Sequence, residues 1–400
     1  MWASVGLLPC SILTLLFTST ATLAASFHVE PRSLTTFSDT DIVSLGTTPD
    51  PLKHIDPYNP HSHLYRILIP RAPDTENNTF VRNHIVTTLR DLDWHVEEDA
   101  FEDNTPYGKK RFTNVIATKD PHAPRRIILS AHFDSKFFPS APMNQFVGAT
   151  DSAAPCAMLL DLAEALNPML DARMHRMDHD QLDDEEQEAS ETTLQLVFFD
   201  GEEAFENWTD TDSVYGARHL AERWSSEFVS PLQARKLRGV ATQLDSIEHL
   251  VLLDLLGAKQ PIIQSYYTST AWLFDGMVAA EHRLGLLGLF NEQSTTNAEG
   301  GEWHTWSSFF KPRTSFEHQS GGIQDDHIPF VKRGVNILHV IANPFPRVWH
   351  TINDDATALD LPTMKRWTLI FRIFTAEYLR LRMSDRSSTR LVKDELVSTS

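Results

Sequence analysis

Residues 194–204 read LQLVFFDGEEA, an apolar run that stops abruptly at Asp200, Gly201, Glu202 and Glu203. A continuous apolar run of this kind is typical of a strand that is buried on both faces of a parallel sheet. In open α/β sheets, ligands bind just beyond the carboxyl ends of such strands. The stretch therefore predicts a buried strand that delivers two adjacent glutamates to a functional site.

Three other apolar runs are followed in the same way by polar and ionisable side chains. Residues 126–130 (RIILS) precede His132 and Asp134, residues 249–253 (HLVLL) precede Asp254, and residues 335–341 (VNILHVI) precede Trp349 and His350. Because the carboxyl ends of parallel strands lie at the same edge of a sheet, we expect these side chains to lie close together. The four runs together predict one metal-binding edge.

Further segments with strand or helix patterns surround these four runs. The apolar pattern predicts strands at 94–101 and 112–118 and helices at 80–94, 155–166, 213–224, 270–287 and 361–381. Residues 291–322 are aromatic, end in two glycines and are expected to be irregular. Strands that alternate with helices predict an α/β fold with a mostly parallel, twisted central sheet and helices on both faces. We expect one catalytic domain over residues 74–385.

Four segments are expected to be poorly packed or to be removed. Residues 1–25 contain no charged side chain, carry an apolar stretch and end in small residues, which is typical of a cleaved secretory signal peptide. An uncleaved membrane anchor is the alternative, since the uncharged stretch is long enough to span a bilayer. Residues 26–73 are predicted to form an irregular N-terminal arm, residues 171–191 a disordered acidic insertion, and residues 386–400 a disordered tail.

The composition limits the class of partner and the redox chemistry. The chain has 54 acidic and 35 basic residues, a net charge of -19, which argues against nucleic acid or an anionic membrane as a partner. We expect a monomer without stable membrane contact. Of the two cysteines, Cys10 lies in the predicted signal peptide, so Cys156 is left alone and no structural disulfide is expected. Asn77 and Asn207 begin glycosylation sequons, the first in a predicted surface loop.

The candidate metal ligands and proton-transfer groups are all His, Asp or Glu: His132, Asp134, Asp151, Glu202, Glu203, Asp254, Asp325, Asp326, His327 and His350. Zinc accepts imidazole nitrogen and carboxylate oxygen, and catalytic zinc sites use three protein ligands. Adjacent Glu202 and Glu203 cannot both face a metal equally, so we expect one to bind it and the other to transfer protons. Singly, each residue has an ordinary alternative role; Asp151, for example, would also serve as a helix N-cap.

The order of these motifs resembles the zinc-dependent aminopeptidase family and, more closely, one branch of it, the glutaminyl-peptide cyclotransferases or glutaminyl cyclases. The matching segments are HFDSK (132–136), GATDSAAPC (148–156), FFDGEEAF (198–205), DSVYGARHL (212–220), LLDLLGA (252–258), IQDDHIPF (323–330) and PFPRVWHT (344–351). They extend over residues 80–381, and runs of this length are highly specific.

The resemblance implies a role for each member of a nine-residue set. One zinc ion per chain would be bound by Asp151, Glu203 and His350, with Glu202 as the proton shuttle; Asp254 and Asp325 would be supporting hydrogen-bonded acids, and Trp208, Phe345 and Trp349 would line the substrate pocket. The implied reaction converts the N-terminal glutamine of peptides or proteins to pyroglutamate and releases ammonia.

The sequence departs from the family at three places, none of them in the implied catalytic set. Ala131 replaces a cysteine that animal enzymes pair with the counterpart of Cys156, the acidic insertion is long, and Asn207 places a sequon beside the pocket tryptophan. Two other functions stay open. A two-zinc aminopeptidase would use His132 and Asp254 for a second metal and Glu202 to activate water. A non-catalytic ectodomain would keep the fold for binding partners.

Overall fold

The computed structural model describes residues 34–237, 241–290, 306–313 and 322–383. Six strands form one sheet in the order β1-β2-β4-β3-β5-β6. Their bounds are β1 His95–Thr105, β2 Gly108–Thr118, β3 Arg125–His132, β4 Thr192–Phe199, β5 Ile247–Asp254 and β6 Ile337–Ile341. Each lies on one of the six apolar runs that the sequence predicts to be strands. The predicted signal peptide, the predicted tail and most of residues 291–322 lie outside the described residues.

The pairing of the strands confirms the predicted α/β class. Strand β3 runs parallel to both β4 and β5, and β5 runs parallel to β6. Strands β1 and β2 form an antiparallel hairpin that joins the sheet through an antiparallel contact of β2 with β4. The ends of β3 and β4 are in register, with His132 opposite Phe199, and Asp254 of β5 lies opposite Ile341 of β6. Four carboxyl ends therefore meet at one edge.

Successive residues of the central strands pack into two different cores. In β4, Leu194, Leu196 and Phe198 belong to the larger core, while Val197 and Phe199 belong to the smaller one. This alternation follows from the two-residue period of a strand, and it explains why a strand covered on both faces is apolar throughout.

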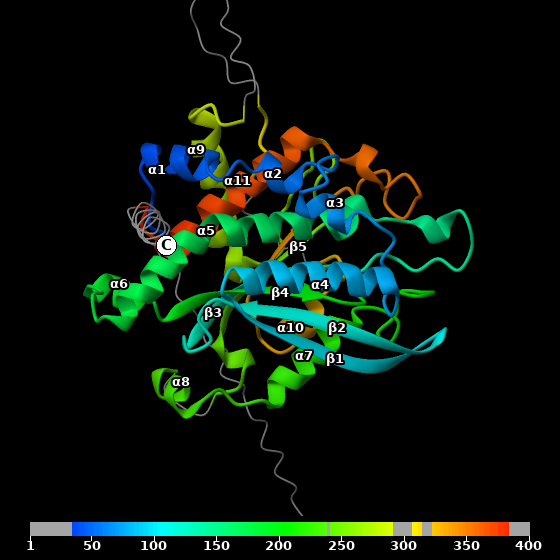
Figure 1. Ribbon diagram of the computed structural model, residues 1–400, viewed down its shortest axis with the longest axis horizontal. Helices are drawn as coiled ribbons and strands as arrows, with labels where there is room; N and C mark the ends of the chain where they lie inside the picture. Colours follow the sequence, from blue (N-terminus) through cyan, green and yellow to red (C-terminus); the bar gives the residue numbers. More distant parts are fainter. Residues whose placement is uncertain (1–33, 238–240, 291–305, 314–321, 384–400) are drawn as a thin grey trace, which may run out of the picture.

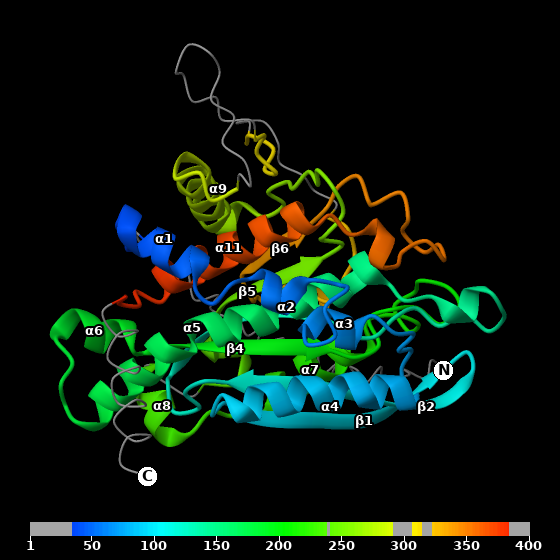
Figure 2. The ribbon, with the colours of Figure 1, turned by 45° about the horizontal axis from the view of Figure 1, so that its top comes forward.

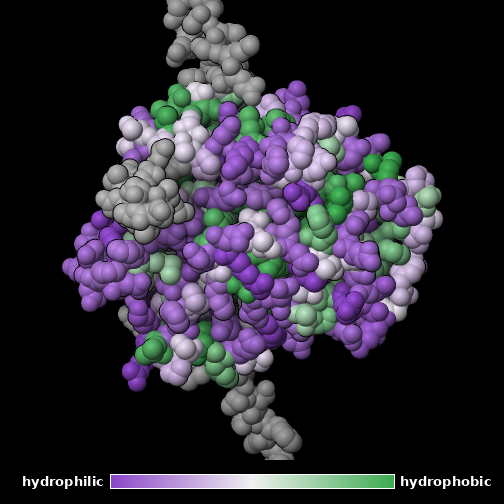
Figure 3. Space-filling view, in the orientation of Figure 1, coloured by the Kyte–Doolittle hydropathy of each residue, from purple (hydrophilic) through white to green (hydrophobic). Residues whose placement is uncertain are grey.

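Helices cover both faces of the sheet (Figures 1 and 2). Those whose side chains join the larger core are α1 Asp39–Thr47, α2 Leu52–Ile55, α3 His63–Ile67, α4 Glu76–Asp91, α5 Ala154–Asp178, α9 Ala271–Leu286 and α11 Leu361–Tyr378. The smaller core is closed by α7 Tyr215–Ser226 and α10 Ile328–Val331, and α6 Asp184–Ala189 and α8 Pro231–Lys236 lie at the periphery. Among the described residues, no helix has both the length and the apolar character that crossing a bilayer requires. The face drawn in Figure 3 is mostly hydrophilic, with hydrophobic residues in small separate groups.

The prediction of an irregular arm over residues 26–73 is wrong for the part that the structure describes. Helices α1, α2 and α3 lie there, and their apolar side chains, Ile42, Leu45, Ile55 and Leu64 among them, are fully buried. The side chains of Ser38 and Ser62 cap α1 and α3 by accepting hydrogen bonds from backbone amides. These helices have only 9, 4 and 5 residues, too few for a helical period to appear in the sequence.

The acidic insertion at 171–191 is also more ordered than predicted. Helix α5 continues through Pro168 to Asp178, and α6 follows after a short turn. Arg173 of α5 donates hydrogen bonds to the carbonyl oxygens of Leu379 and Arg380, at 2.6 and 2.7 Å. Glu186 of α6 pairs with Arg176. Arg380 and Arg382, which are distant in the sequence, also pair with Glu188, Asp183 and Glu186 and so offset the local charge that favoured disorder.

The helix predicted at 80–94 begins earlier, at Glu76. The Thr75 side chain accepts a hydrogen bond from the backbone amide of Asn78 and so caps α4. Asn77 consequently lies in the first turn of the helix and not in a loop, although it is exposed, as its predicted glycosylation requires.

A buried ion pair joins the N-terminal helices to the core, and we expect its loss to be costly. Arg372 of α11 and Asp161 of α5 are both fully buried; the guanidinium pairs with the carboxylate and donates to the carbonyl oxygens of Leu45 and Pro49. Arg372→Met should lower the free energy of unfolding by about 3–5 kcal/mol, because it leaves a buried carboxylate without its main cation. Urea denaturation would measure the change.

The matched control removes an arginine from an exposed pair. Arg313 pairs with Asp275 at the surface, where both side chains are about half exposed. Arg313→Met should cost about 0–1 kcal/mol, because solvent screens such pairs. Equal losses in the two variants would contradict a special role for Arg372.

Candidate active site

A cleft of about 480 Å³ opens at the edge where the four carboxyl ends meet. Its size is within the range of small-molecule sites. Of the nine residues that the resemblance implies, all except Asp325 line it: Asp151, Glu202, Glu203, Trp208, Asp254, Phe345, Trp349 and His350. The predicted metal-binding edge therefore coincides with a cleft.

The three predicted zinc ligands lie together in this cleft. The ligand atoms of Asp151, Glu203 and His350 are all within 4.8 Å of one another. Nε2 of His350 lies 3.2 Å from Oε1 of Glu203 and 3.5 Å from Oδ2 of Asp151. This Oδ2 atom is buried and has no hydrogen-bond partner among the described residues. Two carboxylates and one imidazole are a donor set that zinc accepts, and the free buried oxygen is suited to a cation.

The turn after β4 fixes the two adjacent glutamates. Gly201 has a φ of 75°, and a Cβ atom there would lie 2.5 Å from the ring of Phe112. The carboxylate of Asp134 accepts hydrogen bonds from the backbone amides of Glu202 and Glu203, at 3.2 and 3.4 Å. Asp134, a candidate ligand in the sequence, thus holds the backbone of the glutamate pair and does not line the cleft.

Lys136 restrains the side chain of Glu203. Its ammonium lies 3.4 Å from Oε2 of Glu203 and donates to the carbonyl oxygen of Ala204 at 2.8 Å. Since Oε1 of the same carboxylate faces His350, the two oxygens of Glu203 have different partners. Lys136 was not among the predicted site residues, although it lies in the HFDSK segment.

Glu202 is buried next to several acidic side chains. Burial raises the pKa of Glu202 well above its usual range; the charge of His132 opposes this, and those of Asp325 and Glu203 add to it. A carboxyl group with an environment of this kind, open to a cleft, is suited to exchange protons with a bound ligand.

Asp254 and Asp325 are each held by hydrogen bonds from neighbouring groups. Asp254 accepts from the hydroxyl of Ser152 and from the backbone amide of Leu255. Asp325 accepts from Nε2 of His339 at 2.7 Å and from the backbone amide of Asp326 at 2.6 Å. Both carboxylates are therefore fixed in place.

A second group of possible ligands shares Asp151 with the first. The ligand atoms of His132, Asp151 and Asp254 also lie within 4.8 Å of one another. Nε2 of His132 is 3.0 Å from Oδ1 of Asp151 and 3.5 Å from Oδ1 of Asp254. Burial lowers the pKa of His132, but its hydrogen bonds to Asp134, Asp151 and Asp254 outweigh this and raise it well above the usual range. A protonated His132 would itself supply the positive charge between these carboxylates.

The predicted aromatic residues form walls of the cleft. The Trp349 ring stacks on the His350 ring, with centroids 3.8 Å apart, and meets the Phe345 ring at 5.0 Å. Nε1 of Trp208 donates to Oε1 of Gln324 at 2.8 Å, which fixes the indole. Both tryptophans remain partly exposed, at 39% and 40%. Their faces are therefore available to a ligand.

Five of the predicted ligand and proton-transfer candidates do not line the cleft, although all are buried: His132, Asp134, Asp325, Asp326 and His327. Besides Lys136, three orienting residues were not predicted. Ser152, Gln324 and His339 orient Asp254, Trp208 and Asp325, respectively. A histidine within the apolar run 335–341 was the one visible signal, because such a residue needs a polar partner when it is buried.

Comparison of the sequence with known proteins identifies a family and several relatives. The family described as Peptidase family M28 matches residues 114–375. The chain is 42% identical to the glutaminyl-peptide cyclotransferase of Drosophila melanogaster, over 78% of each chain. It is 41% identical to that of Bos taurus, over 80% of this chain and 81% of the relative.

Solved structures agree with the sequence matches. The crystal structure of Macrostomum lignano glutaminyl cyclase superposes with a TM-score of 0.70 and 38% identity, over 88% of this chain and 96% of that one. A Zn-dependent exopeptidase from Parabacteroides distasonis superposes with a TM-score of 0.54 and 18% identity, over 86% of this chain and 99% of the other. The second likeness shows the shared fold alone.

Proposed function

Since this chain belongs to the glutaminyl-peptide cyclotransferase branch of peptidase family M28, we propose that it converts N-terminal glutamine of peptides or proteins to pyroglutamate and releases ammonia. Glutaminyl-peptide cyclotransferases are acyltransferases, and the chain is an enzyme of that class. One observation carries the proposal: a single cleft holds a three-ligand group, a neighbouring buried carboxyl group and aromatic walls.

We propose one zinc ion per chain at the active site, bound by Asp151, Glu203 and His350. The support is the clustering of their ligand atoms and the buried, unpartnered Oδ2 of Asp151. A zinc ion bound there would act as a Lewis acid that polarises the γ-carbonyl of the substrate.

The reaction needs a proton to leave one nitrogen and reach another. The α-amine forms a bond to the carbonyl carbon of the side-chain carboxamide, the bond from that carbon to the amide nitrogen breaks, and ammonia leaves. Glu202 would accept the proton of the attacking amine and return it to the leaving nitrogen, so one carboxyl group serves both steps. Its position in the cleft beside the ligand group supports this role.

Asp254 and Asp325 would position the reacting groups. Asp254 lines the cleft, and Asp325 is close enough for its charge to raise the pKa of Glu202. Because both carboxylates are held by hydrogen bonds, we propose that they orient the leaving nitrogen and the shuttle without themselves exchanging protons.

Trp208, Phe345 and Trp349 would hold the folded glutamine side chain. Flat apolar walls suit a compact, uncharged side chain and bring the amine close to the carbonyl, which lowers the entropic cost of ring closure. The stacked Trp349 would also fix the orientation of the His350 ring.

The proposed reaction is tested with glutamine-β-naphthylamide and leucine-β-naphthylamide, followed by mass spectrometry. Loss of the mass of ammonia from the glutamine compound, with the naphthylamide bond intact, is the expected result. Release of free naphthylamine from the leucine compound would instead identify a peptidase.

The second candidate function is a two-zinc aminopeptidase. The group His132, Asp151 and Asp254 favours it, because these residues are placed where a second metal ion would share Asp151. Metal content alone does not separate the two enzymes, whereas the product masses do. A chain that acts on neither compound would be the non-catalytic ectodomain.

The ligand assignment makes a prediction about metal content. Asp151→Ala, Glu203→Ala and His350→Ala should each lower zinc occupancy and activity together, because each removes one of three ligands. Zinc measured by plasma mass spectrometry after chelator challenge, beside the initial rate, would check this. Full occupancy in one variant would remove that residue from the ligand set.

The aromatic walls make a prediction about substrate placement. Trp349→Ala should lower kcat/KM for an N-terminal glutamine peptide roughly 10- to 100-fold, because a lost apolar contact of this size is worth about 1.5–3 kcal/mol. Zinc content should stay at the wild-type level. Tyr58→Ala, at an aromatic residue that is 69% exposed outside the cleft, is the control and should leave the kinetics unchanged.

We also propose secretion after cleavage near Ala24 or Ala25, and a monomeric enzyme. The uncharged leader and the exposed sequon at Asn77 support secretion. Recovery of the protein only in membranes, with the leader intact, would favour the anchor.

A further inference from the structure

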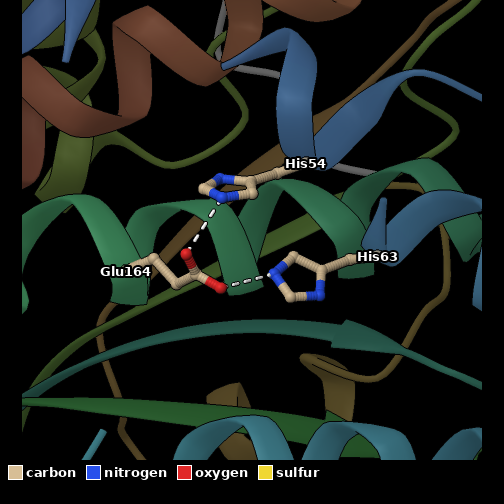
Figure 4. Close-up of side chains that lie close together, drawn as sticks. All are labelled: His54, His63 and Glu164. Carbon is tan, nitrogen blue, oxygen red and sulfur yellow. Dashed lines mark hydrogen bonds and ion pairs between the residues drawn. The ribbon is translucent and has the colours of Figure 1, made fainter. Parts of the chain in front are cut away.

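A further group of possible metal ligands lies between the N-terminal helices and α5, and it shares no residue with the active-site cleft. It consists of His54 from α2, His63 from α3 and Glu164 from α5 (Figure 4). Nε2 of His54 lies 2.9 Å from Oε2 of Glu164, and Nε2 of His63 lies 3.0 Å from Oε1. All three ligand atoms are within 4.8 Å of one another.

The ring of His54 is oriented from its other side by a buried carboxylate. Nδ1 of His54 lies 2.7 Å from Oδ1 of Asp161, one turn before Glu164 on α5. Arg372 pairs with the same carboxylate, so Asp161 is held as an anion that accepts the Nδ1 proton. In metal sites, a carboxylate that fixes the tautomer of a histidine in this way makes the opposite nitrogen a better ligand.

The ring of His63 has a similar partner. Its Nδ1 lies 3.2 Å from Nε2 of His84, which comes from α4. At this distance Nε2 of His84 can accept the Nδ1 proton of His63, which leaves Nε2 of His63 free to bind an ion. Both histidines of the group therefore present Nε2 toward the same carboxylate.

The direct contacts leave the group only partly satisfied. Nε2 of His54 is buried and is not aligned for a hydrogen bond with any described atom, although it lies close to Glu164. A hydrogen bond requires the donor, its hydrogen and the acceptor to lie nearly in a line. A metal ion between the ligand atoms has no such requirement. Ligand atoms around a tetrahedral zinc ion are roughly 3.3 Å apart, given bonds of about 2.0–2.1 Å. The observed separations are a few tenths of an ångström shorter, and each joins a histidine to a different oxygen of Glu164: 2.9 Å from His54 to Oε2 and 3.0 Å from His63 to Oε1.

We propose that His54, His63 and Glu164 form a second zinc site, separate from the catalytic one, that links the N-terminal helices to α5. The three protein ligands leave a fourth position, and the side chain of Glu164 is 27% exposed, which provides room for a water ligand and for entry of the ion. Helix α5 begins at Ala154. At a rise of 1.5 Å per residue, Glu164 lies roughly 15 Å along the helix from that residue.

The surroundings of His54 favour a positive charge, because carboxylate oxygens of Asp161 and Glu164 lie 2.7 and 2.9 Å from its two ring nitrogens. A proton and a metal ion compete for a histidine nitrogen, so zinc binding is measured at slightly alkaline pH.

The test compares zinc content at pH 8 in the wild type, His54→Gln and Glu164→Gln after dialysis against micromolar zinc. Each variant should contain one zinc equivalent less than the wild type. Its rate on a glutamine substrate should stay within about twofold, because neither residue lines the cleft. Glu222→Gln, an exposed glutamate on α7, is the control and should keep the full content.

Crystals of the wild type grown with zinc give an independent readout that needs no variant. An anomalous-difference peak at the zinc edge is expected between the three side chains. Equal zinc content in the wild type and both variants, or the absence of that peak, would show that the group is a hydrogen-bonded cluster only. Cyclase activity is measured separately, so failure of this proposal leaves the proposed reaction untouched.

Discussion

Glu202→Gln should lower kcat on an N-terminal glutamine substrate by roughly 10²- to 10⁴-fold, which is the usual contribution of a general acid–base group. The change keeps the size of the side chain but removes its ability to accept and return a proton. Zinc content should remain that of the wild type, because the ligand group is Asp151, Glu203 and His350. Stopped assays of ammonia release, with zinc measured on the same sample, would check both statements.

Two comparisons make this result interpretable. Glu203→Gln differs by one position in the sequence and should lose zinc together with activity, since Glu203 lies 3.2 Å from His350. Glu222→Gln is exposed on α7 and should change neither quantity. Loss of zinc from the Glu202 variant, with zinc kept in the Glu203 variant, would mean that the two roles are reversed.

The sheet and the position of the site could be predicted because burial on both faces leaves a strong pattern. All eight residues of β4 are buried, and the run 194–199 is therefore apolar except for Gln195, whose side chain donates a hydrogen bond to the hydroxyl of Thr118. Its end at Asp200 is also visible, because charged residues follow at once. The common edge then follows from parallel pairing, which brings His132 and Asp254 close to the glutamates.

The extent of the helices was harder to predict. Pro168 lies inside α5, and an interior proline normally ends a helix, so the sequence suggests an end near residue 166. The helix continues past Pro168, and its Arg173 is tied to the two residues that directly follow α11, a contact between segments more than 200 residues apart. The short helices α1 to α3 likewise depend on tertiary burial, which a local pattern does not contain.

The division of roles within the site also lies beyond the sequence. Asp134 and Asp151 have the same side chain, yet the first accepts hydrogen bonds from two backbone amides and the second faces His350. Only the fold decides which carboxylate oxygen is left without a hydrogen-bond partner. The same holds for His339, whose partner Asp325 is 14 residues away.

N-terminal glutamine should react at least about 10³ times faster than N-terminal glutamate at pH 8. A glutamate substrate carries a carboxylate where glutamine has a neutral amide, and a carboxylate is a poor electrophile. With a pKa near 4.3, roughly one molecule in 5,000 has a neutral γ-carboxyl group at pH 8, and roughly one in 50 at pH 6. The cleft makes the charged form still less favourable, because Glu202, Glu203 and Asp254 line it.

The ratio of the two kcat/KM values should therefore fall by about tenfold for each unit of pH between 8 and 6, as the neutral form of the glutamate substrate increases. A ratio is the useful quantity, because titration of the enzyme and of the α-amine affects both substrates alike and cancels. The γ-methyl ester of glutamate is the control: it is uncharged, so its rate relative to glutamine should not depend on pH. Equal rates for glutamine and glutamate at pH 8, or a ratio that stays constant down to pH 6, would contradict a cleft that selects an uncharged side chain. Charge exclusion would then have to be replaced by an explanation based on the shape of the aromatic walls.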